Sequence, residues 1–175
     1  MTIELIPEMA LSAADERAIA DLLAASFATD FGGRSYYVQR HHLRLVLRDE
    51  GAIVGHMALL YRAIRQGNRL IDIVGLADVA TAPGSRGKGI ASRLLKDAIA
   101  VAQTSPASFL MLFGTAGLYG AHGFVAAQNE LLYVPMEGAA TGELRRDVSD
   151  ALMVLPLRGA DWDGEARTDL LGHKF

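Results

Sequence analysis

A run of small and basic residues between positions 78 and 91 has the composition of a phosphate-binding loop. It reads DVATAPGSRGKGIA and leads from a strand-like segment, through a turn, into a helical pattern. Successive glycines let backbone N–H groups approach a ligand closely, and a helix N-terminus adds unpaired donors and about half a positive charge. Arg86 and Lys88 add two cations. We therefore expect this segment to bind a pyrophosphate.

The spacing of the glycines separates this loop from two common nucleotide-binding loops. A P-loop needs four residues between its first glycine and a Gly-Lys-Ser/Thr unit, which Gly84 and the residues after it do not provide. A dinucleotide-binding loop reads G-x-G-x-x-G, whereas the order here is G-x-x-G-x-G. The alternative is a simple turn at Pro83, with the later glycines only allowing the helix to pack closely.

The loop resembles the R/Q-x-x-G-x-G/A loop of the GCN5-related N-acetyltransferase (GNAT) superfamily, with Arg86, Gly89 and Ala91 at its fixed positions. The segment from 114 to 124, GTAGLYGAHGF, resembles the downstream Tyr-x-x-x-Gly-Phe signature of that superfamily. This resemblance implies acetyl-CoA as co-substrate. The loop residues implied to bind it are Arg86, Gly87, Lys88, Gly89, Ile90 and Ala91. The backbone of Val79, Ala80 and Thr81 is implied to follow the pantetheine arm and to donate to the thioester carbonyl.

Tyr119 occupies the position of the general acid in that superfamily. A phenol with an ordinary pKa near 10 is protonated at pH 7, and it can return a proton to a thiolate whose acid has a pKa of about 8.5. The alternative is a core tyrosine that packs beside Phe124.

The general base must be another residue than in many superfamily members, which have glutamate where this chain has Ala77. Asp78 is our first candidate and His56, with a pKa suited to neutral pH, is the second. Asp72 precedes Asp78 by an even number of residues, so both lie on one strand face unless a bulge intervenes, and the superfamily usually has one. The alternative is that Asp78 and His56 are hydrogen-bonded structural residues.

The tail from 158 to 175 and the segment GHMALL at 55–60 look similar to aminoglycoside 2'-N-acetyltransferases and nodulation-type N-acyltransferases. The resemblance implies that Trp162 and Asp169 contact the acceptor. If the tail folds over the strand end, five carboxylates form an acidic cleft for a cationic amine. These are Asp72, Asp78, Asp161, Asp163 and Asp169. The alternative is a tail that docks its apolar end on the sheet.

Hydrophobic periodicity predicts the elements that position these residues. We expect a single domain over 1–175 with an α/β, mixed sheet that is mostly antiparallel, contains one parallel strand pair and has flanking helices. The expected strands are 2–6, 43–48, 52–64, 69–81, 109–113, 124–134 and 151–157. The expected helices start after Ser12, within 29–42, at Gly87 and at Ala116, and 135–147 is a polar connection.

Composition excludes several other classes. The 17 basic and 20 acidic side chains give a net charge of −3, so nucleic acid is not an expected partner. Without cysteine there is no disulfide, thiolate metal site or thiol nucleophile, and the histidines lack metal-ligand spacing, so we expect no metal. The acidic start does not resemble a signal peptide, which predicts a cytoplasmic protein that does not bind a membrane. The sequence leaves open whether the protein forms a homodimer.

These observations together predict an enzyme that transfers acetyl from acetyl-CoA to a primary amine of a small acceptor by direct attack. One alternative is a longer acyl donor, as in the nodulation-type enzymes. Another is a CoA-binding sensor or partner protein without turnover.

Overall fold

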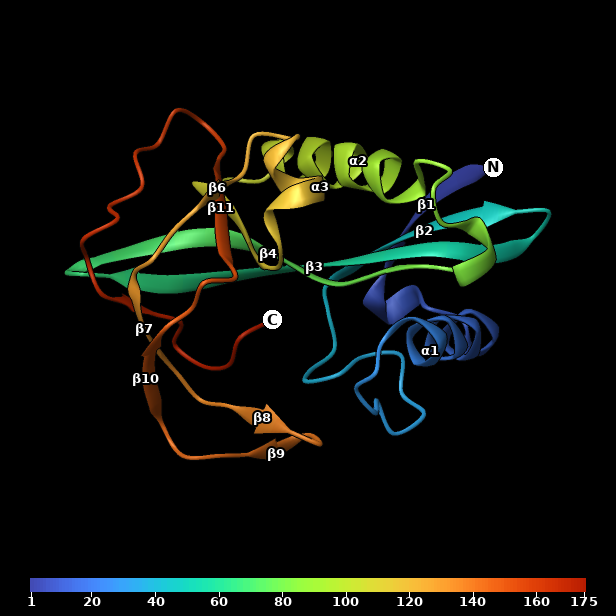
Figure 1. Cartoon of the computed structure of the whole chain (residues 1–175), viewed down its shortest axis with the longest axis horizontal. Helices are drawn as coiled ribbons and strands as arrows, with labels where there is room; N and C mark the ends of the chain where they lie inside the picture. The colour runs from blue at the N-terminus through green and yellow to red at the C-terminus, as the bar shows by residue number, and fades with distance from the viewer.

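A hairpin of two long strands forms the middle of the molecule and carries the rest of a ten-stranded sheet on its edges (Figure 1). The computed structural model describes residues 1–175. In the hairpin, β3 (Ala52–Gln66) and β4 (Arg69–Thr81) pair antiparallel. From the first half of β3, β2 (Leu43–Asp49) and then β1 (Thr2–Pro7) continue the sheet, also antiparallel.

On the other edge of the hairpin, β5 (Phe109–Phe113) pairs parallel with β4. The crossover between these strands runs through the longest helix, α2 (Ile90–Thr104). Beyond β5 the sheet continues antiparallel with β11 (Leu152–Pro156) and the short β6 (Val125–Ala126). The loop 82–89 therefore leads from the end of β4 to the N-terminus of α2.

The helices cover both faces of the sheet (Figure 1). α2 and the short α3 (Ala116–Gly120) lie on one face, and α1 (Ala13–Ser26) lies on the other. Successive residues of β2 follow this division: Leu45 and Leu47 pack with α2, whereas Val46 packs with α1, as the two-residue period of a strand requires. No helix in the structure is both long enough and apolar enough to cross a membrane.

A third part of the sheet is attached through the tail. β12 (Thr168–Asp169) pairs antiparallel with the end of β3 and parallel with β7 (Glu130–Tyr133). β10 (Arg145–Val148) then pairs antiparallel with β7. Between β7 and β10 in sequence, β8 (Met136–Glu137) and β9 (Ala140–Thr141) form a separate hairpin.

The structure confirms the mixed, mostly antiparallel sheet with flanking helices, the three-strand meander and the parallel pairing of β4 with β5. α1 begins after Ser12 as expected, because the Ser12 hydroxyl accepts a hydrogen bond from the Asp15 amide at 3.0 Å.

Four details of the predicted fold were wrong. No helix forms between residues 29 and 42, and the connection at 135–147 contains β8, β9 and the start of β10. β12 adds a second parallel pair. The expected strand at 124–134 divides into β6 and β7 because Asn129 turns inward and donates to the backbone carbonyls of Asp163 and Ala166, each at 2.8 Å.

A β-bulge interrupts β4 near its end. Ala77 pairs with Ala58 and Ala80 pairs with His56, so two residues of β4 lie opposite one residue of β3. The first of them, Asp78, has a φ of 48°, a left-handed conformation that is costly for a residue other than glycine. The surrounding contacts must therefore hold this backbone in place.

A buried hydrogen-bond network supports the bulge. His56 has no exposed surface, and its Nδ1 lies 2.7 Å from the Asp78 carbonyl, to which it donates. Its Nε2 accepts from the guanidinium of the equally buried Arg44 at 3.2 Å. Arg44 also donates to both carboxylate oxygens of Glu8, at 2.6 and 3.0 Å, and to the Ser35 carbonyl at 2.6 Å. Every ring nitrogen of His56 is thus paired.

The same network determines the charge of its members. Burial, followed by the nearby Arg44 charge, lowers the pKa of His56 to about 3, so the ring is neutral at pH 7. Burial alone would raise the pKa of Glu8, but the hydrogen bonds and charges of Arg44 and Arg40 outweigh it and lower that pKa. The bulge is therefore supported by a neutral imidazole and a buried ion pair.

The pKa of His56 predicts a dependence of stability on pH. An unfolded histidine binds a proton near pH 6.5, whereas folded His56 binds one only near pH 3, so the unfolded state takes up more protons between these values. The free energy of unfolding should fall by up to about 1.4 kcal/mol for each pH unit below 6.5 through this group alone. Urea denaturation from pH 7 to 5 should show a steeper loss in the wild type than in His56→Gln. Parallel curves would contradict the assignment.

Candidate active site

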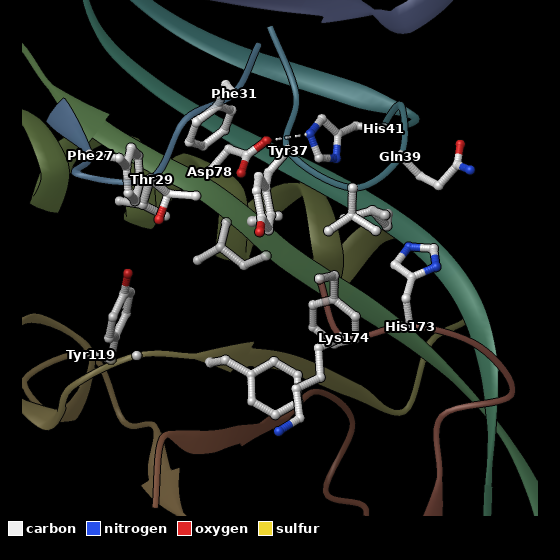
Figure 2. A pocket seen from close by; sticks show the side chains of 18 of the residues that line it. Phe27, Thr29, Phe31, Tyr37, Gln39, His41, Asp78, Tyr119, His173 and Lys174 are labelled. Atoms are coloured by element: carbon white, nitrogen blue, oxygen red, sulfur yellow. Dashed lines mark hydrogen bonds and ion pairs between the residues drawn. The ribbon is translucent and has the colours of Figure 1, made fainter. Parts of the chain in front are cut away.

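A cavity of about 570 Å³ opens beside the bulge of β4 (Figure 2). It is lined by the segment between α1 and β2, by the end of β4, by residues from the end of β5 to α3, and by the last three residues of the chain. These segments are far apart in sequence. A cavity that gathers side chains from several elements in this way is the usual form of a small-molecule site.

One wall of the cavity is a length of β4 that pairs with β3 on one edge and has no strand partner on the other. The pairing of β4 with β5 ends at Leu76 and Leu112, whereas β4 continues to Thr81. Beyond Leu76 the backbone groups on this edge of β4 have no β5 residue to pair with. Val79 of this stretch lines the cavity. The unpaired edge can hydrogen-bond an extended ligand that contains amide groups.

The sequence-predicted phosphate loop follows this edge. Gly87 and Gly89 have φ values of 77° and 72°, which require glycine, and α2 begins at Ile90. A Cβ at Gly84, Gly87 or Gly89 would meet no protein atom within 4 Å, so the space beside the loop is open. Arg86 and Lys88 are exposed, whereas the Ile90 side chain belongs to the core. The loop therefore offers backbone N–H groups, two exposed cations and a helix N-terminus to an anion.

Tyr119 projects from α3 toward the cavity, and Figure 2 shows its hydroxyl directed into it. Its ring packs edge-on against Phe124 with centroids 5.8 Å apart. Gly114 permits this position, because a Cβ there would lie 2.7 Å from the Tyr119 ring. Burial raises the pKa of Tyr119 above its usual value, so the phenol keeps its proton at neutral pH. Tyr119 therefore packs beside Phe124 and lines the cavity at the same time.

Asp78 also lines the cavity, and it is paired with a residue that the sequence analysis did not select. His41 Nε2 lies 2.8 Å from Asp78 Oδ2 (Figure 2). His41 comes from the segment between α1 and β2, which has no hydrophobic period, and its spacing from other histidines and acids suggested no role. Its side chain is 4% exposed and its Nδ1 has no hydrogen-bond partner. The pairing leaves Asp78 Oδ1 free.

The structure does not bring four other candidates into the cavity. His56 is fully buried behind the bulge, with both ring nitrogens paired. Asp72 is exposed beside Tyr61 on the neighbouring strand. Trp162 donates to Asn129 at 2.8 Å and packs against Phe109. Asp169 lies in β12 and accepts from the Leu171 amide.

The expected acidic cleft is therefore wrong. Of the five carboxylates assigned to it, only Asp78 lines the cavity. The bulge and the insertion of β12 into the sheet direct the others elsewhere; Asp163, for example, accepts hydrogen bonds from the amides of Glu165 and Ala166.

The tail forms a wall of the cavity by its last three residues. The Arg62 guanidinium donates to the carbonyls of Leu170 and His173, at 2.6 and 2.9 Å. Phe175 packs on Gly75, where a Cβ would lie 2.7 Å from its ring. The expectation that the tail docks its apolar end on the sheet agrees with this arrangement. No group of three or more His, Cys, Asp or Glu side chains in the structure could hold a metal ion.

Comparison with known proteins adds to this geometry. A domain family described as "Acetyltransferase (GNAT) domain" matches residues 9–127. No curated protein matches the sequence significantly.

Several solved structures share the fold. A GNAT family acetyltransferase from Brucella melitensis, in complex with acetyl-CoA, is 20% identical over 95% of each chain, with a TM-score of 0.61. The GNAT family protein YhbS from Escherichia coli, in complex with CoA, is 20% identical over 97% of this chain and 88% of its own, with a TM-score of 0.63. The ribosomal-protein-S18-alanine N-acetyltransferase from Escherichia coli is 18% identical over 93% of this chain and 98% of its own, with a TM-score of 0.61.

Identities this low establish the shared fold and not a shared substrate. The domain match, in contrast, spans more than half of the sequence and includes α2, Asp78 and Tyr119. The chain therefore belongs to the GNAT acetyltransferase family.

Proposed function

We propose that this protein transfers the acetyl group of acetyl-CoA to an amine. One observation carries the proposal: the unpaired end of β4, Asp78 and Tyr119 border one cavity, and the glycine loop follows from that strand end. Binding of acetyl-CoA or CoA by two structures of the same fold supports this choice of co-substrate. The chain thus combines an anion site with an acid and a base.

The residues of the loop fit the diphosphate of acetyl-CoA. The backbone N–H groups of residues 87–91 would bind its oxygens, with Arg86 and Lys88 at the rim, because nothing covers the glycines. The backbone groups of residues 79–81 on the edge of β4 that faces away from β3 would bind the amides of the pantetheine arm; these residues are Val79, Ala80 and Thr81. Bound in this way, acetyl-CoA supplies an activated acetyl group where the pairing of β4 with β5 ends.

Asp78 and Tyr119 fit the proton transfers of the reaction. An ammonium must lose a proton before it can attack, and Asp78 Oδ1 is free to accept it while His41 holds Oδ2. The amine nitrogen then bonds to the acetyl carbon as the carbon–sulfur bond breaks. The departing sulfur takes the proton of the Tyr119 phenol, which its raised pKa keeps in place until then. The nitrogen of the new amide gives its extra proton to the Tyr119 phenolate, and Asp78 releases its proton to solvent. His56, neutral and buried, holds the Asp78 backbone and moves no proton.

Release of free CoA tests the proposed function directly. We expect thiol to appear from acetyl-CoA only when a suitable amine is present, at a rate that depends on both concentrations. A thiol assay over a panel of amines measures this. Binding of acetyl-CoA without thiol release from any amine would instead indicate a sensor or partner protein, and faster release from longer acyl-CoA thioesters would indicate a different acyl donor.

Replacement of Gly89 tests the anion site. Gly89→Val places a β-branched residue at a φ of 72° and adds bulk in the open space beside the loop, so the dissociation constant for acetyl-CoA should rise at least about tenfold. Isothermal titration calorimetry measures it. Gly84→Ala is the matched control, because Gly84 has no positive φ and its Cβ would meet nothing within 4 Å. Equal affinities of both variants and the wild type would refute the anion site.

Replacement of Tyr119 tests the general acid. Tyr119→Phe keeps the ring that packs on Phe124 and removes the proton donor, so kcat should fall about a hundredfold while the affinity for acetyl-CoA is retained. Tyr61→Phe, on a tyrosine outside the cavity, should keep full turnover. Steady-state kinetics of both variants measure the difference. Full turnover by Tyr119→Phe would leave Tyr119 as a core residue only.

A further inference from the structure

The charges around the cavity are too few for a polycationic acceptor. Asp78 is the single acidic side chain in the lining. The single lysine, Lys174, has its ammonium 3.5 Å from Asp147 and 4.1 Å from the centre of the Tyr133 ring, and Figure 2 shows it at the side of the cavity opposite Asp78. A second ammonium on the acceptor would find no second acidic side chain in the lining. Burial of an unpaired charge strongly disfavours binding.

Aromatic rings, in contrast, line the cavity on two sides. Phe27 and Tyr37 each pack against Phe31 with ring centroids 5.4 Å apart. Phe113 and Phe175 are also 5.4 Å apart, and all five rings line the cavity. Tilted rings at such distances leave edges and faces against which an apolar or aromatic group can pack.

Contacts with other residues of the protein hold one ring of each wall, Phe31 and Phe175, in place. Phe31 is 5% exposed and belongs to the core beneath α1. Phe175 fits against Gly75, and the Arg62 guanidinium lies 5.7 Å from its ring centre while it holds the tail by two backbone carbonyls. A preformed aromatic wall binds without the entropy loss of ordering side chains.

From these observations we infer that the acceptor is a monoamine with an apolar or aromatic body. Its ammonium binds at Asp78 Oδ1, and its body packs between the Phe31 and Phe175 walls. This inference rests on the proposed function and adds the substrate class. It replaces the polycationic acceptor that the sequence suggested with a ligand of one charge.

Three amines separate the substrate classes in the thiol-release assay. These are 2-phenylethylamine, with one charge and an aromatic body; ethanolamine, with one charge and a polar body; and spermidine, with three charges. We expect kcat/KM for 2-phenylethylamine to exceed that of the other two at least about tenfold. A larger value for ethanolamine or spermidine would overturn the inference and leave acetyl transfer intact.

Two tail variants connect this preference to the aromatic wall. Phe175→Ala should raise KM for 2-phenylethylamine about tenfold and leave KM for acetyl-CoA unchanged, because Arg62 holds the tail by its backbone. Leu171→Ala, on an exposed side chain of the same tail, should change neither constant. An unchanged KM in Phe175→Ala would count against the wall.

The inference and the proposed function fail separately. If no amine releases thiol, isothermal titration calorimetry should measure the affinity of the protein for the same three amines. Preferential binding of 2-phenylethylamine would retain the inferred ligand class and overturn acetyl transfer. Preference for spermidine or ethanolamine, or no binding at all, would overturn both.

Discussion

The guanidinium of Arg44 has no access to solvent, and a buried charge must be fully paired. Its partners come from three parts of the chain, and Arg44 itself lies in β2: Glu8 follows β1, Ser35 lies in the segment before β2, and His56 lies in β3. Removal of one partner from such a group typically costs about 3–5 kcal/mol. The segment around Ser35 is thereby fixed without any helix or strand of its own, and with it Tyr37 and His41 over the end of β4.

Through His56, the pairing of Arg44 also supports Asp78 in the candidate active site. The second nitrogen of His56 holds the Asp78 carbonyl, and the backbone at Asp78 takes the left-handed conformation of the bulge. Beyond the bulge, β4 runs on without β5 and delivers the chain to the N-terminus of α2. The buried ion pair of Arg44 and Glu8 on the α1 side of the sheet and the glycine loop before α2 are thus connected through the bulge in β4.

The sequence could predict the features that depend on residues close together in the chain, but not those that depend on contacts between distant residues. The meander depends on glycine-containing separators, Asp49-Glu50-Gly51 and Gln66-Gly67-Asn68, and α2 depends on its own apolar period, so local patterns sufficed. The same holds for Asp78 and Tyr119, whose places next to a strand end and in a short helix follow from nearby motifs. The sequence did not predict the role of His41, because this role depends on a contact with Asp78, 37 residues away. The tail residues Trp162 and Asp169 were misplaced because Asn129 and β12 decide their path. The narrower resemblance to aminoglycoside and nodulation enzymes stays a prediction.

β12 is only two residues long, yet β7 and β10 join the main sheet solely through it. Thr168 pairs with Leu131, so this part of the sheet cannot close during synthesis until residues some distance beyond β7 have left the ribosome. The strands, loop and helices that carry Asp78, Gly89 and Tyr119 are all made earlier, and chains generally fold from the N-terminal side first. During biosynthesis the side of the cavity formed by Phe31, Asp78 and Tyr119 can therefore assemble before the side formed by Phe175, which depends on the pairing of the tail with the sheet.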